Sequence, residues 1–117
     1  MLVGIDNNGL LIALMISKFT NIRVATLEQF FEKKMISNGN YSINQNCIND
    51  FNQIKNVLMV SDSVNTGKTI TEVKNRINQS NEFNNINIKY FTVYYVNNSA
   101  LNYVDIALQK LNTVNFL

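Results

Sequence analysis

A polar segment spanning residues 61–69 carries the residue types best suited to holding a phosphate group. It follows residues 57–60, a run of four apolar residues that is β-branched at both ends and too short for a helix, which predicts a buried strand. Behind the segment, Ile70, Val73 and Ile77 recur at helical spacing. The segment therefore lies where a strand passes into a helix, so that free backbone N–H groups and the positive end of the helix dipole face one small concavity.

Individual side chains add to this predicted phosphate site. Gly67 lets the backbone approach an anion closely and adopt a positive φ, while Thr66 and Thr69 add hydroxyl donors. Gly67, Lys68 and Thr69 also fit the end of the Walker A motif, but Asp62 occupies the position of that motif's first glycine. An acidic side chain there would point at the nucleotide phosphates, which excludes a Walker A loop.

The segment instead resembles the motif that binds phosphoribosyl diphosphate (PRPP) in the type I phosphoribosyltransferases. That motif has four apolar residues, two acidic residues, two variable ones, Asp or Ala, and then Thr-Gly-x-Thr, which Asp62, Thr66, Gly67 and Thr69 match. Lys68 follows the glycine as in the hypoxanthine-guanine enzymes, the version of the motif most similar to this segment. The resemblance implies that Asp62 holds the ribose hydroxyls and that Thr66, Gly67, Lys68 and Thr69 hold the 5-phosphate.

Two positions depart from the motif. Ser61 stands where the first acidic residue is expected, and it can hydrogen-bond a ribose hydroxyl at roughly half the strength of a charged acceptor. Asn65 stands where the purine-specific enzymes carry an Asp proposed as a general base, and an amide cannot take a proton. Asp62 and Asn65 thus occupy the catalytic positions of the family. The resemblance also implies Mg²⁺ that bridges diphosphate and ribose oxygens, with Asp62 as its protein ligand.

A second turn, over residues 3–10, resembles the pyrophosphate-binding loop of the same family. Gly9 matches the loop in type, whereas Asn7 stands at a basic position and Asn8 at a glycine. The loss of a cation at Asn7 predicts weaker binding of pyrophosphate, because a neutral amide offers only dipoles to a multiply charged anion. The alternative is an ordinary turn between a strand and a helix with no ligand.

Other side chains have less specific roles in the resemblance. Tyr103 is the candidate for stacking on the base, with a tyrosine packed at the sheet edge as the alternative. Residues 28–46 would correspond to the family's mobile loop, where Lys33 and Lys34 could supply positive charge or form an ordinary solvated pair.

The elements that must position these residues alternate between strand and helix, which favours parallel pairing with right-handed crossovers. The chain of 117 residues supports one domain, residues 1–117, and one core. We therefore predict an α/β domain with a mainly parallel sheet and flanking helices. The expected strands cover residues 2–5, 21–27, 57–60 and 86–96, and the expected helices cover residues 10–19, 47–55 and 70–77.

Composition excludes several classes of function. The net charge is +2 with scattered lysines and arginines, so no stripe for nucleic acid is expected. The chain has no His, which excludes a Cys-His nucleophile pair. Its single Cys, Cys47, cannot form an internal disulfide, and this is typical of a cytoplasmic protein. The apolar run at residues 10–15 is too short to span a membrane. The resemblance implies a homodimer.

Two functions from different classes follow. The first is binding of PRPP or a nucleoside monophosphate, with transfer of a phosphoribosyl group to or from a nucleobase. The second is a catalytically degenerate member that binds a phosphorylated ligand or a partner protein, which Ser61, Asn65 and Asn7 favour. A small nucleotide-binding fold unrelated to this family is a third possibility. The sequence does not identify the base.

Overall fold

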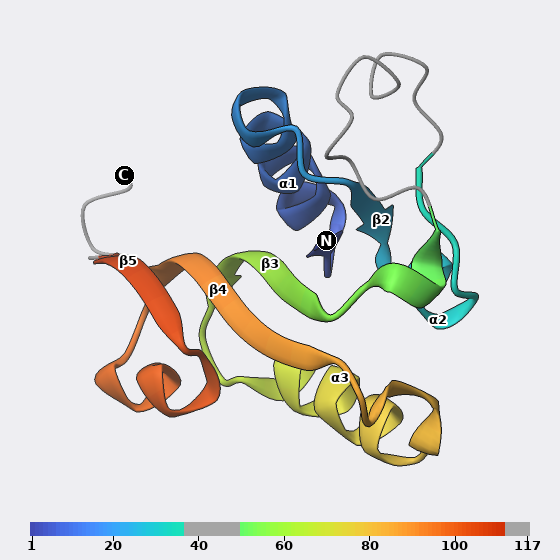
Figure 1. Ribbon diagram of the computed structural model, residues 1–117. Helices are drawn as coiled ribbons and strands as arrows, with labels where there is room; N and C mark the ends of the chain where they lie inside the picture. The colour runs from blue at the N-terminus through green and yellow to red at the C-terminus, as the bar shows by residue number, and fades with distance from the viewer. Residues whose placement is uncertain (37–49, 112–117) are drawn as a thin grey trace.

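The computed structural model describes residues 1–36 and 50–111, which form one β-sheet with helices packed against it (Figure 1). In chain order the elements are β1 (Leu2–Gly4), α1 (Asn7–Thr20), β2 (Val24–Thr26), α2 (Leu27–Phe31), η2 (Phe51–Gln53), β3 (Asn56–Val64), α3 (Lys68–Asn78), η3 (Asn81–Phe83), β4 (Asn87–Tyr95), η4 (Asn98–Tyr103) and β5 (Ile106–Lys110), where η marks a short 3-10 helix.

The strands form one sheet in the order β2-β1-β3-β4-β5, and every neighbouring pair is parallel. The predicted fold class is confirmed. Because all the strands run the same way, their carboxyl ends meet at one edge of the sheet, and the turns that follow β1 and β3 lie next to each other there. These are the two turns that the sequence singled out.

Helices cover both faces of this sheet, with α1 on one side and α3 on the other (Figure 1). Alternate residues of each strand point to opposite faces, so Leu2 and Val60 pack with Ala13 of α1, whereas Val3 and Met59 belong to the core on the opposite face. That second core contains residues of α2, α3 and η3, among them Phe30, Ile70, Val73 and Phe83. The rings of Phe30 and Phe83 stack at 4.7 Å between centroids.

Helix α1 begins at Asn7, three residues before the predicted start, because Asp6 caps it. Asp6 has extended backbone angles, and its carboxylate accepts a hydrogen bond from the Gly9 N–H at 2.6 Å. At the other end, Asn21 adopts the left-handed conformation and returns its N–H to the Ser17 carbonyl. The apolar run at residues 10–15 is thus the middle of a surface helix.

Strand β3 extends beyond its apolar part to Val64. Its polar end pairs with β4, where Ser61 lies opposite Thr92 and Ser63 opposite Tyr94. Strand β2 is shorter than predicted: its last residue, Thr26, still pairs with Gly4 of β1 and also caps α2, which begins directly after it.

The C-terminal part of the chain contains a strand, β5, that the sequence analysis did not predict. The helix predicted at 47–55 reduces to η2, and its first residues, with Cys47, lie outside the described residues. Within the described part of the chain, no helix combines the length and apolar character needed to cross a membrane.

Candidate functional site

A cavity of about 210 Å³ opens at the carboxyl end of β3, where the sequence predicts the phosphate site. Its walls contain Ser61, Asn65, Thr66, Gly67, Lys68 and Thr69 of the predicted set, together with Asp6, Ser63, Val64 and Ile70. The structure therefore brings most of the predicted loop around one concavity. Lys68 is the single cationic side chain among the described residues of this lining.

The N-terminus of α3 forms the floor of the predicted phosphate cradle. Gly67 precedes the helix with φ of 78°, and as the N-cap it offers no side-chain hydrogen bond. The Thr66 hydroxyl accepts a long bond of 3.4 Å from the Lys68 N–H. The next two amides, of Thr69 and Ile70, are first-turn amides that have no intrahelical acceptor, so an anion in the cavity could receive their hydrogen bonds.

Gly67 lies directly against the ring of Tyr103. A Cβ atom built on Gly67 would lie 2.5 Å from ring carbons of Tyr103, which is too close for any side chain. Lys74 of α3 donates to the backbone carbonyl of Tyr103 at 3.0 Å, and its ammonium lies 4.7 Å from the centre of the Tyr90 ring. The structure thus places Tyr103 against the cradle's glycine and ties η4 to α3. Its role in base stacking stays a prediction.

Asp62 lies beside the cavity lining rather than within it. It is partly exposed, and its carboxylate accepts a bond of 3.5 Å from the Asn8 side chain, across from the other predicted loop. The two turns therefore meet through Asp62 and Asn8.

The two positions that depart from the family motif already have partners in the protein. The Ser61 hydroxyl is buried and donates to the Ser63 carbonyl at 3.1 Å. The side-chain amide oxygen of Asn65 accepts a hydrogen bond of 3.2 Å from the side-chain amide of Asn97. Both side chains stabilise the turn that follows β3, and each would have to give up or share its bond to contact a ligand.

In the turn after β1, Asn7 and Asn8 are exposed and Gly9 is buried. A side chain on Gly9 would collide with the Val60 carbonyl oxygen, so this glycine is explained by close packing of α1 on β3. The loop is bound to the sheet by a bond of 3.0 Å from the Ile5 N–H to the same carbonyl.

Asp6 is the functional residue that the sequence analysis missed. An Asp directly before an apolar helix is a typical N-cap, and this is the sequence signal that could have identified it. It joins the cavity wall because the parallel register of β1 and β3 places the two turns side by side.

The described residues contain no group of three or more His, Cys, Asp or Glu side chains that could hold a metal by themselves. A hard cation bound mainly through ligand phosphates needs only one or two protein carboxylates, and Asp62 fits that limited requirement. Magnesium was predicted at Asp62, and this stays a prediction.

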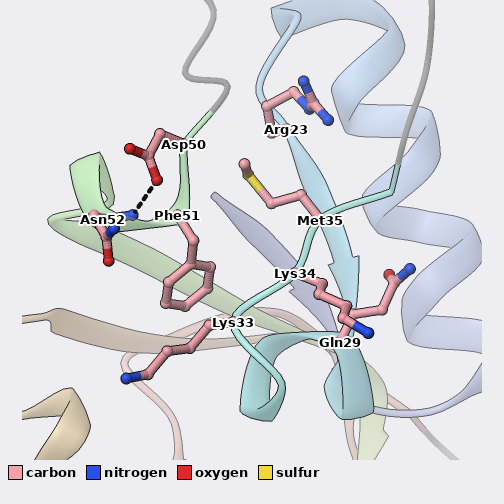
Figure 2. A pocket seen from close by; sticks show the side chains of 8 residues that line it. All are labelled: Arg23, Gln29, Lys33, Lys34, Met35, Asp50, Phe51 and Asn52. Atoms are coloured by element: carbon pink, nitrogen blue, oxygen red, sulfur yellow. Dashed lines mark hydrogen bonds between the residues drawn. The ribbon is translucent and has the colours of Figure 1, made fainter.

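A larger cavity, of about 640 Å³, lies elsewhere, between α2 and η2 (Figure 2). Figure 2 shows the Lys33 and Lys34 side chains leading away from each other rather than toward a common point. Each ammonium forms an exposed ion pair, Lys33 with Glu82 at 3.6 Å and Lys34 with Glu32 at 3.3 Å. These pairs favour solvated lysines, the alternative that the sequence left open.

Comparison with known proteins agrees with this geometry at the level of the fold. No protein-family model and no curated protein matches the chain. Among solved structures, it is similar to orotate phosphoribosyltransferase from Aeropyrum pernix, with a TM-score of 0.59 and 13% sequence identity over 97% of this chain. The chain shares its fold with a phosphoribosyltransferase.

This chain spans only 60% of the length of that neighbour. The neighbour acts on orotate by its name, so the closer resemblance to hypoxanthine-guanine enzymes stays a prediction from the motif alone. The similarity bears out the predicted fold.

Proposed function

We propose that this protein binds a 5-phosphorylated pentose, either PRPP or a nucleoside monophosphate, with the 5-phosphate in the cradle of residues 65–69. One observation carries the proposal: α3 begins directly after Gly67, which provides no side-chain cap, beneath a cavity that Lys68, Thr66 and Thr69 line. Amides at a helix N-terminus, hydroxyl donors and one cation suit a phosphate monoester. The fold shared with a phosphoribosyltransferase adds support.

In this proposal Asp62 holds the ribose hydroxyls beside the cradle. Its bond to Asn8 orients the carboxylate between the two turns. Ser61 would contribute a hydroxyl after exchanging its bond to Ser63. Mg²⁺ would be held by Asp62 and by oxygens of the ligand, where it lowers the negative charge of the phosphates.

The reaction that such a ligand could undergo is transfer of the phosphoribosyl group to or from a nucleobase. Asn65 cannot act as a base, so this chain's contribution would be positioning of the sugar and complementarity to a positively charged, oxocarbenium-like ribose. Asp62 is the carboxylate placed to stabilise that charge. Tyr103, which lies against Gly67, is the aromatic side chain available beside the base.

The second candidate is a ligand-binding protein of the same fold without catalysis. Three observations favour it: Asn65 is already bonded to Asn97, Asn7 offers no cation, and Asp6 adds a carboxylate to the wall.

Calorimetric titration with PRPP and with ribose 5-phosphate, with and without Mg²⁺, tests binding. An assay for pyrophosphate release with a panel of purine and pyrimidine bases tests transfer. Binding with release for one base supports the transferase, and binding without release for any base supports the second candidate. If neither ligand binds, or if the Thr69→Val variant binds both ligands as tightly as the parent protein does, the proposal is wrong.

The other expectations follow from the resemblance. We propose a homodimer in the cytoplasm whose partners are a phosphoribosyl ligand and a nucleobase, with neither nucleic acid nor membrane among them. Sedimentation velocity tests the homodimer: a single monomeric species at all concentrations would contradict it.

A further inference from the structure

Two helices point their N-termini at the same edge of the sheet, and only one of them is available to an anion. Helix α1 follows β1 and helix α3 follows β3, and these strands are hydrogen-bonded neighbours. Both helices exceed ten residues, so each carries a positive partial charge at this edge. A ligand with two separate phosphate groups could in principle use both ends.

The N-terminus of α1 already holds a negative charge from its own chain. The Asp6 carboxylate accepts from the Gly9 N–H at 2.6 Å, the shortest kind of charge-assisted bond to a backbone amide. The N-terminus of α3 has Gly67 at the same position and no charged cap. One helix end is therefore occupied by a carboxylate, and the other is open.

The side chains around the cavity repeat this asymmetry. Lys68 lies on the side of α3, whereas the wall that comes from the β1 turn contributes Asp6. Beyond that wall stand the neutral amides of Asn7 and Asn8, and Asn8 is bonded to a second carboxylate, Asp62. A group that extends from the cradle toward β1 meets two carboxylates, and the turn after β1 offers it no cationic side chain.

We infer that the site takes a pentose with a single phosphomonoester and selects against a diphosphate on the sugar, with Asp6 as the specificity-determining residue. This inference rests on the proposed function, because it assumes that the 5-phosphate occupies the α3 cradle. A diphosphate adds several negative charges, and repulsion by Asp6 and Asp62 opposes them. A nucleoside monophosphate carries no such group and avoids the repulsion.

The test compares ribose 5-phosphate with PRPP in the parent protein and in Asp6→Asn. Asn is as good an N-cap as Asp, so the variant removes the charge and keeps the bond to Gly9. Without divalent cations and at low salt, we expect the parent protein to bind ribose 5-phosphate at least as tightly as PRPP. Asp6→Asn should improve the affinity for PRPP relative to ribose 5-phosphate by about two- to fivefold, the range that one exposed charge contributes.

Asp50→Asn is the matched control. Asp50 is also exposed and also caps a helical turn, accepting from the Asn52 N–H at 3.0 Å, but it lies at the other cavity. It changes the net charge by the same amount, so a general effect of charge would shift both variants alike. The shift in Asp6→Asn should also shrink at high salt, where exposed charges are screened.

The outcomes separate the two proposals. If ribose 5-phosphate does not bind, the proposed function and this inference both fail. If it binds, but the parent protein prefers PRPP by tenfold or more without Mg²⁺, or the affinity ratio in Asp6→Asn equals that in Asp50→Asn, the inference is wrong and the proposed function stands.

Discussion

At the scale of single residues, Gly67 combines a positive φ with a close neighbour, so it tolerates little change. Its φ of 78° disfavours any other residue, and a side chain would meet the ring of Tyr103. We predict that Gly67→Ala destabilises the protein by about 1–2 kcal/mol from the backbone alone, with a further cost from the ring. Urea unfolding measures the stability, and titration with ribose 5-phosphate measures the loss of affinity.

A double-mutant cycle separates the two causes. In a Tyr103→Ala background the steric cost of Gly67→Ala should disappear and the cost of the positive φ should remain. Strictly additive effects of the two substitutions would contradict the contact. The substitution does not place its side chain in the phosphate cradle, because the Cβ points to Tyr103, so any loss of affinity reflects a moved backbone.

A second residue-scale prediction concerns Tyr90. Burial, and then the nearby Asp105 carboxylate, raise the pKa of Tyr90 to about 12. Its ordinary pKa is 10.0, which is also the value expected in the unfolded chain. Above that pH the unfolded chain loses the proton while the folded protein keeps it, so stability falls as the pH rises from 10 to about 12. Ultraviolet titration of the phenol and urea unfolding across this range measure the effect.

Tyr90→Phe is the control for that prediction. It removes the hydroxyl and keeps the ring beneath the Lys74 ammonium, so the contact between the two side chains is present in both proteins. The loss of stability between pH 10 and 12 should be smaller in the variant. An identical loss would assign the effect to other groups.

At the scale of elements, caps decide where helices begin. Thr26 ends β2 and caps α2: its hydroxyl accepts from the Gln29 N–H at 3.1 Å, and the Gln29 side chain accepts from the Thr26 N–H at 3.0 Å. We predict that Thr26→Ala lowers the free energy of unfolding by about 1 kcal/mol, whereas Thr26→Ser keeps the bond and most of the stability. Equal loss in both variants, measured by urea unfolding, would argue against the cap.

The same caps explain why the sequence predicted some elements better than others. Strand β4 and helix α3 have clear apolar periodicity, and their predicted positions are close to those observed. The starts of α1 and α2 depend on Asp6 and Thr26, which no periodicity reveals. Strand β5 exposes four of its five residues and pairs only at the sheet edge, so its sequence lacks the pattern of a buried strand.

At the scale of the whole molecule, the site could be predicted only in part because it joins two turns that are distant in sequence. The cradle of residues 65–69 lies in one continuous segment, so its motif was visible. Asp6 enters the cavity through the pairing of β1 with β3, and Tyr103 reaches Gly67 through η4. Such neighbours follow from strand order, which the apolar pattern does not determine.

Strand order also predicts how stability is distributed across the sheet. Strand β3 has hydrogen-bonded neighbours on both sides and is largely buried, whereas among residues 1–36 and 50–111 β5 pairs with β4 alone. We expect backbone amides of β5 to exchange with solvent through local opening, at a lower free energy than amides of β3. Hydrogen exchange followed by mass spectrometry or NMR measures both strands in one experiment.

The same measurement at two protein concentrations bears on assembly. Helix α1 exposes Leu11, Met15 and Phe19 along one stripe, and β5 exposes Ile106 and Leu108. If copies of the chain associate through α1 or through β5, the backbone amides of that element should exchange more slowly as the protein concentration rises, while the exchange of β3 amides stays unchanged. Protection of β5 equal to that of β3 in dilute solution would contradict the expected order, since a strand exposed on its outer edge opens without disrupting the core.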